Sequence, residues 1–241
     1  MNKTALITGA SKRIGKALAK HLASKGWNLA LHYNSSATQA KSLQQELSQQ
    51  HPESQFEIFK ANLMRAEEVE QLIPEVSKQF SSIDLLINNA SVFEPGYLKD
   101  SSFDLLRQQL AVNFEAPFLL CKAMANQTAN GIIINFVDTR ITNNQSNYAA
   151  YSISKKALWE LTKMAALELA PGIRVNAIAP GVTLPPEDKD ESYLWNLAAN
   201  IPMKRPGGLE PILQSLDYIL ANSHLTGQLL FADGGENLGK N

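Results

Sequence analysis

The chain has 241 residues, of which 44% are hydrophobic, and its 22 basic and 23 acidic residues give a net charge of −1. That length can bury one substantial core, so we expect a single domain over residues 1–241. No basic block marks a surface for nucleic acid or membrane, and no apolar run is long enough to span a bilayer. Residues 1–4 run straight into a predicted strand, so we expect no signal peptide. One cysteine, Cys121 in an apolar stretch, excludes a disulfide framework and a cysteine-rich metal site. We expect a cytoplasmic protein without a metal and with neither nucleic acid nor membrane as partner.

Short apolar runs alternate with helical patterns along the whole chain. The predicted strands cover residues 4–9, 28–33, 56–59, 83–87, 132–137, 173–178 and 228–231. The predicted helices run from the turn after the first strand to residue 26, and over residues 36–50, 66–80, 102–127 and 149–170. This alternation predicts an α/β fold: one Rossmann domain with a doubly wound parallel sheet of about seven strands.

Residues 181–208 interrupt the alternation. They include Pro185, Pro186, Pro202 and Pro206 and an acidic run at 187–191, and they are too many for an ordinary connection. We interpret this segment as a lid or substrate loop. Its aromatic residues, Tyr193 and Trp195, are explained equally well by packing and by substrate contact.

Three residues in the second half of the chain have the chemistry of a catalytic site. Asp138 stands where the strand 132–137 stops, and Tyr151 and Lys155 are one helical turn apart on the next helix. An ammonium near a phenol favours the phenolate, so we expect Lys155 to lower the pKa of Tyr151 toward neutrality. Taken alone, the pair is also what an ordinary helix surface carries. Tyr148 has Ser152 four residues later rather than a cation, so no role is predicted for it.

The carboxyl ends of parallel strands meet at one edge of the sheet, and ligands of open α/β sheets bind there. That edge is expected to gather Gly9, Asn62, Asn88, Asp138 and Pro180. The turn from Gly9 to Gly15 joins the first strand to the first helix, where glycines and free amides suit a pyrophosphate. This placement favours dinucleotide binding over a plain turn.

The end of the second strand distinguishes NAD from NADP. An acidic residue there would bind the ribose 2′-hydroxyl and repel a 2′-phosphate, but residues 32–36 read His-Tyr-Asn-Ser-Ser. Ser35 and Ser36 are candidates to cap the next helix and present its amides to a phosphate, and Lys12 or Arg13 would add charge. A plain cap would be compatible with either cofactor. We predict NADPH.

With these motifs in view, the chain resembles the short-chain dehydrogenase/reductase family over essentially its whole length. The resemblance rests on Thr8-Gly9-x3-Arg13-x-Gly15, Asn88-Asn89-Ala90, Asn113, Tyr151-x3-Lys155, Pro180-Gly181 and Asp233-Gly234-Gly235. It implies hydride transfer from a nicotinamide with Tyr151 as proton donor, Lys155 on the nicotinamide ribose, and Asn113 holding a water in the proton path. It also implies a homotetramer packed through the helices 102–127 and 149–170.

The resemblance extends the cofactor site to many positions. The residues expected to contact the cofactor are Gly9, Ser11, Lys12, Arg13, Ile14, Gly15, His32, Tyr33, Asn34, Ser35, Asn62, Leu63, Asn89, Ala90, Ser91, Tyr151, Lys155, Pro180 and Gly181.

Two departures from the common family pattern bear on the substrate. Most members have serine where this chain has Asp138, 13 residues before the tyrosine, and a carboxylate there would oppose the negative charge that develops on a reduced ketone. Asp138 suits a C=N bond, whose nitrogen needs a proton. Most members have glycine at the place of Arg13, whose planar fork suits both a phosphate and a flat heterocycle.

Both departures resemble the pteridine reductases and dihydromonapterin reductases. The resemblance implies that Ser91 contacts the substrate or a phosphate and that Phe93 stacks on a pterin opposite the nicotinamide, which a flat ring favours. The expected substrate residues are Arg13, Ser91, Phe93, Asp138 and Tyr151. The expected substrate is a dihydropterin, with dihydrofolate as a weaker one.

Two other readings stay open. The first is an ordinary carbonyl reductase of the family, for example one acting on a 3-oxoacyl carrier protein, against which Arg13 and Asp138 argue. The second is a dinucleotide-binding relative without catalysis, against which Asn113, Tyr151 and Lys155 argue.

Overall fold

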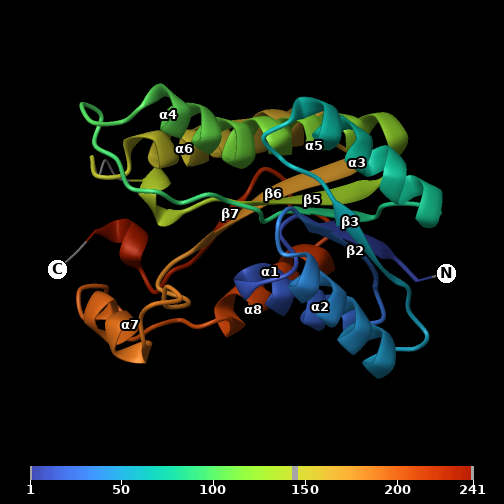
Figure 1. Cartoon of the computed structure of the whole chain (residues 1–241), viewed down its shortest axis with the longest axis horizontal. Coiled ribbons are helices and arrows are strands. Elements are labelled where there is room, and N and C mark those ends of the chain that lie inside the picture. Colours follow the sequence, from blue (N-terminus) through green and yellow to red (C-terminus); the bar gives the residue numbers. More distant parts are fainter. Residues whose placement is uncertain (1, 143–145, 240–241) are drawn as a thin grey trace.

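The sheet has the predicted architecture. The computed structural model of the protein describes residues 2–142 and 146–239. Within them seven parallel strands form one sheet in the order β3-β2-β1-β4-β5-β6-β7 (Figure 1). The strands are β1 (Thr4–Ile7), β2 (Asn28–Tyr33), β3 (Phe56–Lys60), β4 (Leu85–Asn88), β5 (Gly131–Phe136), β6 (Ile173–Pro180) and β7 (Leu229–Ala232). The predicted single-domain Rossmann fold with about seven parallel strands is confirmed.

Helices cover both faces of the sheet (Figure 1). One layer contains α1 (Arg13–Ala23), α2 (Ala37–Gln50) and α8 (Glu210–Ala221), and the other contains α3 (Ala66–Gln79), α4 (Phe103–Leu110), α5 (Ala116–Gln127) and α6 (Ala149–Leu169). Because both faces are covered, the central strands β1 and β4 are buried at every position, whereas the edge strand β3 carries Glu57 and Lys60.

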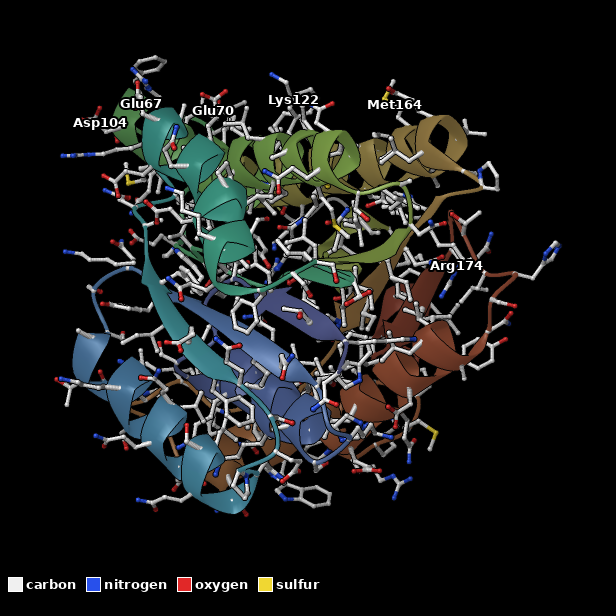
Figure 2. The ribbon with its side chains drawn as sticks, turned by 90° about the vertical axis from the view of Figure 1, so that its right-hand side faces the viewer. Glu67, Glu70, Asp104, Lys122, Met164 and Arg174 are labelled. Carbon is white, nitrogen blue, oxygen red and sulfur yellow. The ribbon has the colours of Figure 1, made fainter. Side chains whose placement is uncertain are left out.

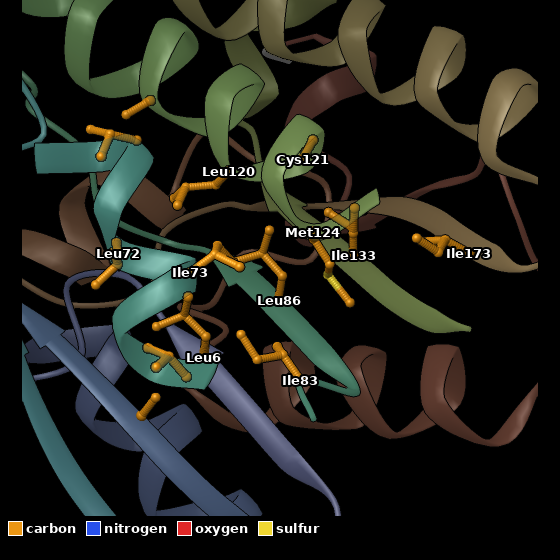
Figure 3. Close-up of a cluster of buried hydrophobic side chains, with 14 of the residues drawn as sticks. Leu6, Leu72, Ile73, Ile83, Leu86, Leu120, Cys121, Met124, Ile133 and Ile173 are labelled. Atoms are coloured by element: carbon orange, nitrogen blue, oxygen red, sulfur yellow. The ribbon is translucent and has the colours of Figure 1, made fainter. Parts of the chain in front are cut away.

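The described core forms three clusters, and the strand register assigns the two largest to opposite faces of the sheet. Leu6 of β1 packs with Leu86 and Ile133 in the cluster that α3 and α5 cover (Figure 3). Its neighbours Ala5 and Ile7 belong to the cluster on the other face, with side chains from α1, α2 and α8. A slip of one residue would exchange the faces, and each buried leucine or isoleucine contributes about 1.5–3 kcal/mol. The register therefore fixes where each strand ends and where the residues after it lie.

The helix predicted over 102–127 is interrupted. Between α4 and α5, residues Ala111–Glu115 form a π-helical turn that contains Asn113. Pro117, four residues after Asn113, has no N–H to donate to the Asn113 carbonyl, and its ring crowds that carbonyl. The wider turn accommodates this lost bond, and such π-bulges are frequent at functional sites.

The sequence analysis did not predict two of the helices. α7 (Glu191–Ala198) lies inside the segment interpreted as a loop, and the Asp190 side chain caps it by accepting a hydrogen bond from the Ser192 amide (3.0 Å). The acidic run is thus partly a helix start, where negative charge stabilises the helix dipole. α8 buries Ile212, Leu216 and Ile219, spaced four and three apart, which is a helical pattern that could have been predicted.

The outer faces of α3 to α6 carry both charged and apolar side chains. Figure 2 shows Glu67 and Glu70 on α3, Asp104 on α4 and Lys122 on α5 projecting outward, together with Met164 of α6. In the part of the chain described, no helix combines the length and the apolar character needed to cross a membrane.

Candidate functional site

A groove of about 950 Å³ runs along the carboxyl ends of the strands. This is within the usual size range of ligand pockets. Every residue predicted for the cofactor and the substrate lines it: Gly9, Ser11, Lys12, Arg13, Ile14, Gly15, His32, Tyr33, Asn34, Ser35, Asn62, Leu63, Asn89, Ala90, Ser91, Phe93, Asp138, Tyr151, Lys155, Pro180 and Gly181. Of the predicted catalytic residues, Asn113 alone lies outside the described lining.

Asp138, Tyr151 and Lys155 meet at the middle of this groove. Asp138 follows β5, and the Tyr151 hydroxyl, in the first turn of α6, donates a hydrogen bond to its Oδ2 (2.8 Å). The Arg140 amide donates to the other carboxylate oxygen (2.8 Å) as Asp138 caps a short 3₁₀ turn. Lys155 is buried and donates to the Phe136 carbonyl (2.8 Å), with its Nζ 5.8 Å from the centre of the Tyr151 ring. The carboxylate is therefore fixed at both oxygens and joined to the phenol.

The protonation of this group differs from the expectation. Burial, the negative charge of Asp138 and the hydrogen bond to it raise the pKa of Tyr151 well above its ordinary value. Burial lowers the pKa of Lys155 to about 8, although the charge of Asp138 acts in the opposite direction. The prediction that Lys155 lowers the pKa of Tyr151 is wrong for this arrangement, because the ammonium bonds to the main chain and the carboxylate adjoins the hydroxyl. At neutral pH Tyr151 keeps its proton and directs it at Asp138.

Asn113 positions the loop beside the site. Its buried side-chain oxygen accepts hydrogen bonds from the Ser91 hydroxyl (3.1 Å) and the Val92 amide (2.9 Å), and its nitrogen donates to the Val92 carbonyl (2.9 Å) and the Ser154 hydroxyl (3.1 Å). The side-chain oxygen already has two donors, so the water implied by the family resemblance would have to bind the main-chain carbonyl. That carbonyl is the one that Pro117 deprives of an α-helical donor.

The turn between β1 and α1 requires its glycines. Gly9 adopts φ +64°, and a Cβ on Gly15 would lie 2.1 Å from the Gly9 carbonyl oxygen. Left-handed backbone and this contact both exclude ordinary side chains. The turn therefore holds the N-terminus of α1 at the groove, where Arg13, Ile14 and Gly15 are among the lining residues.

His32 supports this turn from below. Its Nδ1 accepts a hydrogen bond from the Gly9 amide (3.1 Å), so its Nε2 carries the proton and donates it to the Ala61 carbonyl (3.0 Å). Burial lowers the pKa of His32 to about 4, so the ring is neutral at pH 7. His32 was predicted to contact the cofactor; its ring lines the groove, but both nitrogens are bonded to the main chain, which makes it a support for the turn.

The groove fits a phosphorylated dinucleotide. Residues 33–36 carry no carboxylate and line the groove, and the Ser36 hydroxyl at the start of α2 caps none of the described helix amides. The first turn of α1 has no acidic residue, while Lys12 and Arg13 stand at its start. These residues match the donors that a pyrophosphate and a ribose phosphate need.

Arg13 lines the groove as predicted, yet its guanidinium contacts the lid. Its two terminal nitrogens donate to the carbonyls of Pro185 (2.8 Å) and Leu184 (3.3 Å). The neighbouring Lys12 forms an ion pair with Glu187 (3.8 Å). The turn and the lid are thus joined above the groove.

Phe93 forms an aromatic wall with a residue that the sequence analysis set aside. Its ring stacks on Tyr148, with centres 4.4 Å apart and planes 5° from parallel, and meets Tyr151 edge-on at 4.6 Å. The Arg140 guanidinium lies 4.5 Å from the centre of the Tyr148 ring. Tyr148 and Arg140 both line the groove and were missed. Tyr148 precedes Tyr151 by three residues, a spacing that places both on one side of a helix start.

The lid aromatics separate. Tyr193 lines the groove together with Leu194 and Leu197, whereas Trp195, 56% exposed, lies outside the described lining.

Comparison with known proteins supports a family assignment. Residues 3–192 match the profile of a family described as short chain dehydrogenase. The 3-oxoacyl-[acyl-carrier-protein] reductase FabG of Staphylococcus epidermidis is 33% identical, covering 98% of this chain and 99% of that one. Glucose 1-dehydrogenase of Gluconobacter oxydans is 32% identical, covering 98% and 92%.

Solved structures show the same fold. FolM Alternative dihydrofolate reductase 1 from Brucella suis, in complex with NADP, has a TM-score of 0.92 at 32% identity and covers 99% of this chain and 96% of that one. A blue fluorescent protein from a metagenomic library, in complex with NADPH, has a TM-score of 0.88 at 28% identity and covers 97% of both chains.

Proposed function

The chain belongs to the short chain dehydrogenase family, and from that premise we propose that it is an NADPH-dependent reductase of a dihydropterin. The product is the tetrahydropterin, and dihydrofolate is a further substrate. The observation that carries the proposal is the 2.8 Å hydrogen bond between the Tyr151 hydroxyl and the Asp138 carboxylate. It places a carboxylate at the position where a ketone reductase needs a group that stabilises the developing oxyanion.

When bound, NADPH would supply the hydride that the carbon of the substrate C=N bond gains. The adjacent nitrogen must gain a proton, so that one hydride and one proton saturate the bond. Tyr151 donates this proton and Asp138 holds the hydroxyl in position, while the negative carboxylate favours the protonated, cationic form of the C=N group. Because the raised pKa of Tyr151 keeps the phenol protonated, the donor is loaded at neutral pH.

The cofactor residues follow from the groove. The turn around Gly9 and Gly15 and the start of α1 would hold the pyrophosphate, Lys155 the nicotinamide ribose, and Asn34 to Ser36 the 2′-phosphate. Support for NADPH comes from the lack of a carboxylate at residues 33–36 and from NADP in the FolM structure.

The substrate ring would lie against Phe93, with Ser91 and Tyr151 at its edge. Flat aromatic walls favour planar heterocycles over aliphatic chains. Tyr148 supports Phe93 from the other side by stacking. The similarity to a protein described as an alternative dihydrofolate reductase supports the same substrate class.

A second candidate is reduction of a carbonyl. Relatives described as 3-oxoacyl-[acyl-carrier-protein] reductases, 32–33% identical over 98% of the chain, favour it. Asp138 argues against it, for the electrostatic reason given above.

The test follows NADPH absorbance with dihydromonapterin, dihydrobiopterin, dihydrofolate and acetoacetyl-coenzyme A. We expect oxidation with the pterins, a slower rate with dihydrofolate and none with the thioester. Turnover of the thioester alone would establish the carbonyl reductase instead. NADPH binding without oxidation by any of the four would indicate a relative without catalysis.

A further inference from the structure

Two consecutive residues of the β1–α1 turn reach across the groove to the lid. The Arg13 guanidinium donates to the carbonyls of Leu184 and Pro185 at 3.3 and 2.8 Å, and Lys12 pairs with Glu187 at 3.8 Å. The Arg13 hydrogen bonds involve two separate nitrogens and two adjacent carbonyls, so they fix both the position and the orientation of this lid segment. The Lys12 pair is weaker, because Glu187 is 79% exposed and water screens it.

The backbone of Arg13 is unusual. Among the described residues other than glycine, only Arg13 and Lys204 have positive φ, and Arg13 has φ +52°. Such strain persists where surrounding contacts over-determine it, and it is concentrated at ligand clamps and switches. The side-chain contacts that accompany it here are those to the lid.

Arg13 also begins α1, at the point where a phosphate would bind. The first turn of that helix carries no acidic residue, and its residues Ile14 and Gly15 also line the groove. A guanidinium has five N–H donors in a plane, and the lid carbonyls engage two of its nitrogens. Its remaining donors are available in number to bond a phosphate oxygen in the groove.

We propose that Arg13 is a positioning residue that links cofactor binding to lid closure. One edge of its guanidinium holds Leu184 and Pro185, and another edge bonds the pyrophosphate, so each contact orients the group for the other. The lid residues Leu184, Tyr193 and Leu194 that line the groove would then be held in place for substrate more firmly when the cofactor is bound. This inference rests on the dinucleotide part of the proposed function and not on the identity of the substrate.

The coupling is measurable without catalysis. Hydrogen exchange, followed by mass spectrometry, reports opening of the lid peptide 182–194 with and without saturating NADP⁺, and titration calorimetry reports NADP⁺ binding to the same samples. Wild-type protein should exchange more slowly with NADP⁺, by about fivefold or more for a coupling of ordinary size.

Two substitutions of Arg13 distinguish the effect of its positive charge from the effect of its hydrogen-bonding geometry. Arg13→Lys keeps a cation for the phosphate but cannot bond two carbonyls and a phosphate together. NADP⁺ should therefore still bind, while the ratio of lid exchange rates without and with NADP⁺ should fall to near one. Arg13→Gly suits the positive φ without strain and should likewise uncouple the lid, which keeps the test intact if the lysine variant folds poorly. Glu187→Gln is the matched control, because it removes only the exposed ion pair and should keep wild-type protection.

The outcomes are distinct. If wild type fails to bind NADP⁺, the proposed function fails. If NADP⁺ binds and both Arg13 variants keep wild-type protection, or if NADP⁺ accelerates lid exchange in wild type, the coupling through Arg13 is wrong and the proposed function stands. In the reductase assay, loss of coupling should raise the KM for pterin more than it lowers kcat.

Discussion

Asp138 lies within hydrogen-bonding distance of the Tyr151 hydroxyl, and its second oxygen accepts from the Arg140 amide. Both oxygens are therefore directed by neighbours, and the carboxylate has little freedom to turn away from the Tyr151 hydroxyl. The same rigidity makes the residue a sensitive point for substitution, because asparagine preserves the shape and removes the charge.

Asp138→Asn should lower kcat for dihydropterin by about 10²-fold or more, since the proton donor loses its charged partner. NADPH affinity should change little. Steady-state rates and NADPH binding measured on the same preparation test this, with Asp104→Asn on the outer face of α4 as the control. An unchanged kcat would remove Asp138 from the mechanism.

Asn34 lies at the end of β2, where an acid would select NADH. Asn34→Asp is nearly isosteric and adds one negative charge beside the expected 2′-phosphate. We expect the preference for NADPH over NADH to fall by about tenfold or more, because like charges in contact cost several kcal/mol. The ratio of kcat/KM for the two cofactors measures it, and Asn62→Asp, on the neighbouring strand end, shows whether any added acid has the same effect.

For single residues, the sequence predicted the site where the interacting residues are close together in the chain or mark the end of a strand. The spacing of Tyr151 and Lys155 and the strand end at Asp138 were enough to place the three together. Tyr148 was missed because its partner, Phe93, is 55 residues away in the sequence, and ring stacking leaves no pattern in spacing. The pKa of Tyr151 was predicted in the wrong direction because burial and the hydrogen-bonded carboxylate of Asp138 both raise it, and sequence does not report burial.

The elements around the first turn are held together by one neutral side chain. His32 belongs to β2, accepts from the turn after β1 and donates to Ala61 after β3. Three adjacent strand ends thus depend on an imidazole that must stay unprotonated, because protonation would add a donor where the Gly9 amide already points.

This arrangement predicts acid sensitivity. The pKa of His32 is about 4 in the folded protein against 6.5 for the free side chain, so the unfolded chain binds the proton first. The stability contributed by neutral His32 is complete above pH 6.5 and is lost as pH falls toward 4, by about 3 kcal/mol in total. Urea unfolding of wild type and His32→Asn at pH 7.5 and 4.5 measures it. Asparagine does not titrate, so wild type should lose more stability than the variant over this interval; equal losses would contradict the argument.

The boundaries of strands and helices were predictable where the apolar pattern was strong. The prediction failed where a single hydrogen bond, made or missing, decides the boundary. The strands were placed within a few residues, because buried parallel strands have a continuous apolar composition. The break in the helix near Asn113 depends on the missing N–H of Pro117, and α7 depends on one cap at Asp190. Such local chemistry is visible in the sequence, but only tertiary packing determines whether it bends, ends or starts a helix.

Across the whole molecule, apolar side chains are exposed on two neighbouring helices. Phe118 on α5 is 47% exposed, and Met164 and Leu167 on α6 are 67% and 84% exposed. Figure 2 shows Met164 projecting from this outer layer. Grouped apolar side chains on a folded surface mark contact with another chain. They support the proposal of a homotetramer packed through these helices.

We expect wild type to elute, with light-scattering detection, at four times the 26.5 kDa of one chain. Phe118→Glu combined with Leu167→Glu should reduce the mass to that of a dimer or a monomer, because two buried charges per chain would oppose association. Glu70→Gln on the outer face of α3 should leave the mass unchanged. A monomeric wild type would exclude the tetramer.

The parallel rings of Phe93 and Tyr148 have a bearing on how product leaves. Stacking on Tyr148 restrains the Phe93 ring, so little ordering entropy would be lost when a flat molecule lies on it. Reduction converts a planar C=N carbon to a tetrahedral one, and the puckered ring loses part of its contact with a rigid plane. The site would thus bind the planar substrate more tightly than the puckered product, so each turnover would favour release of the product.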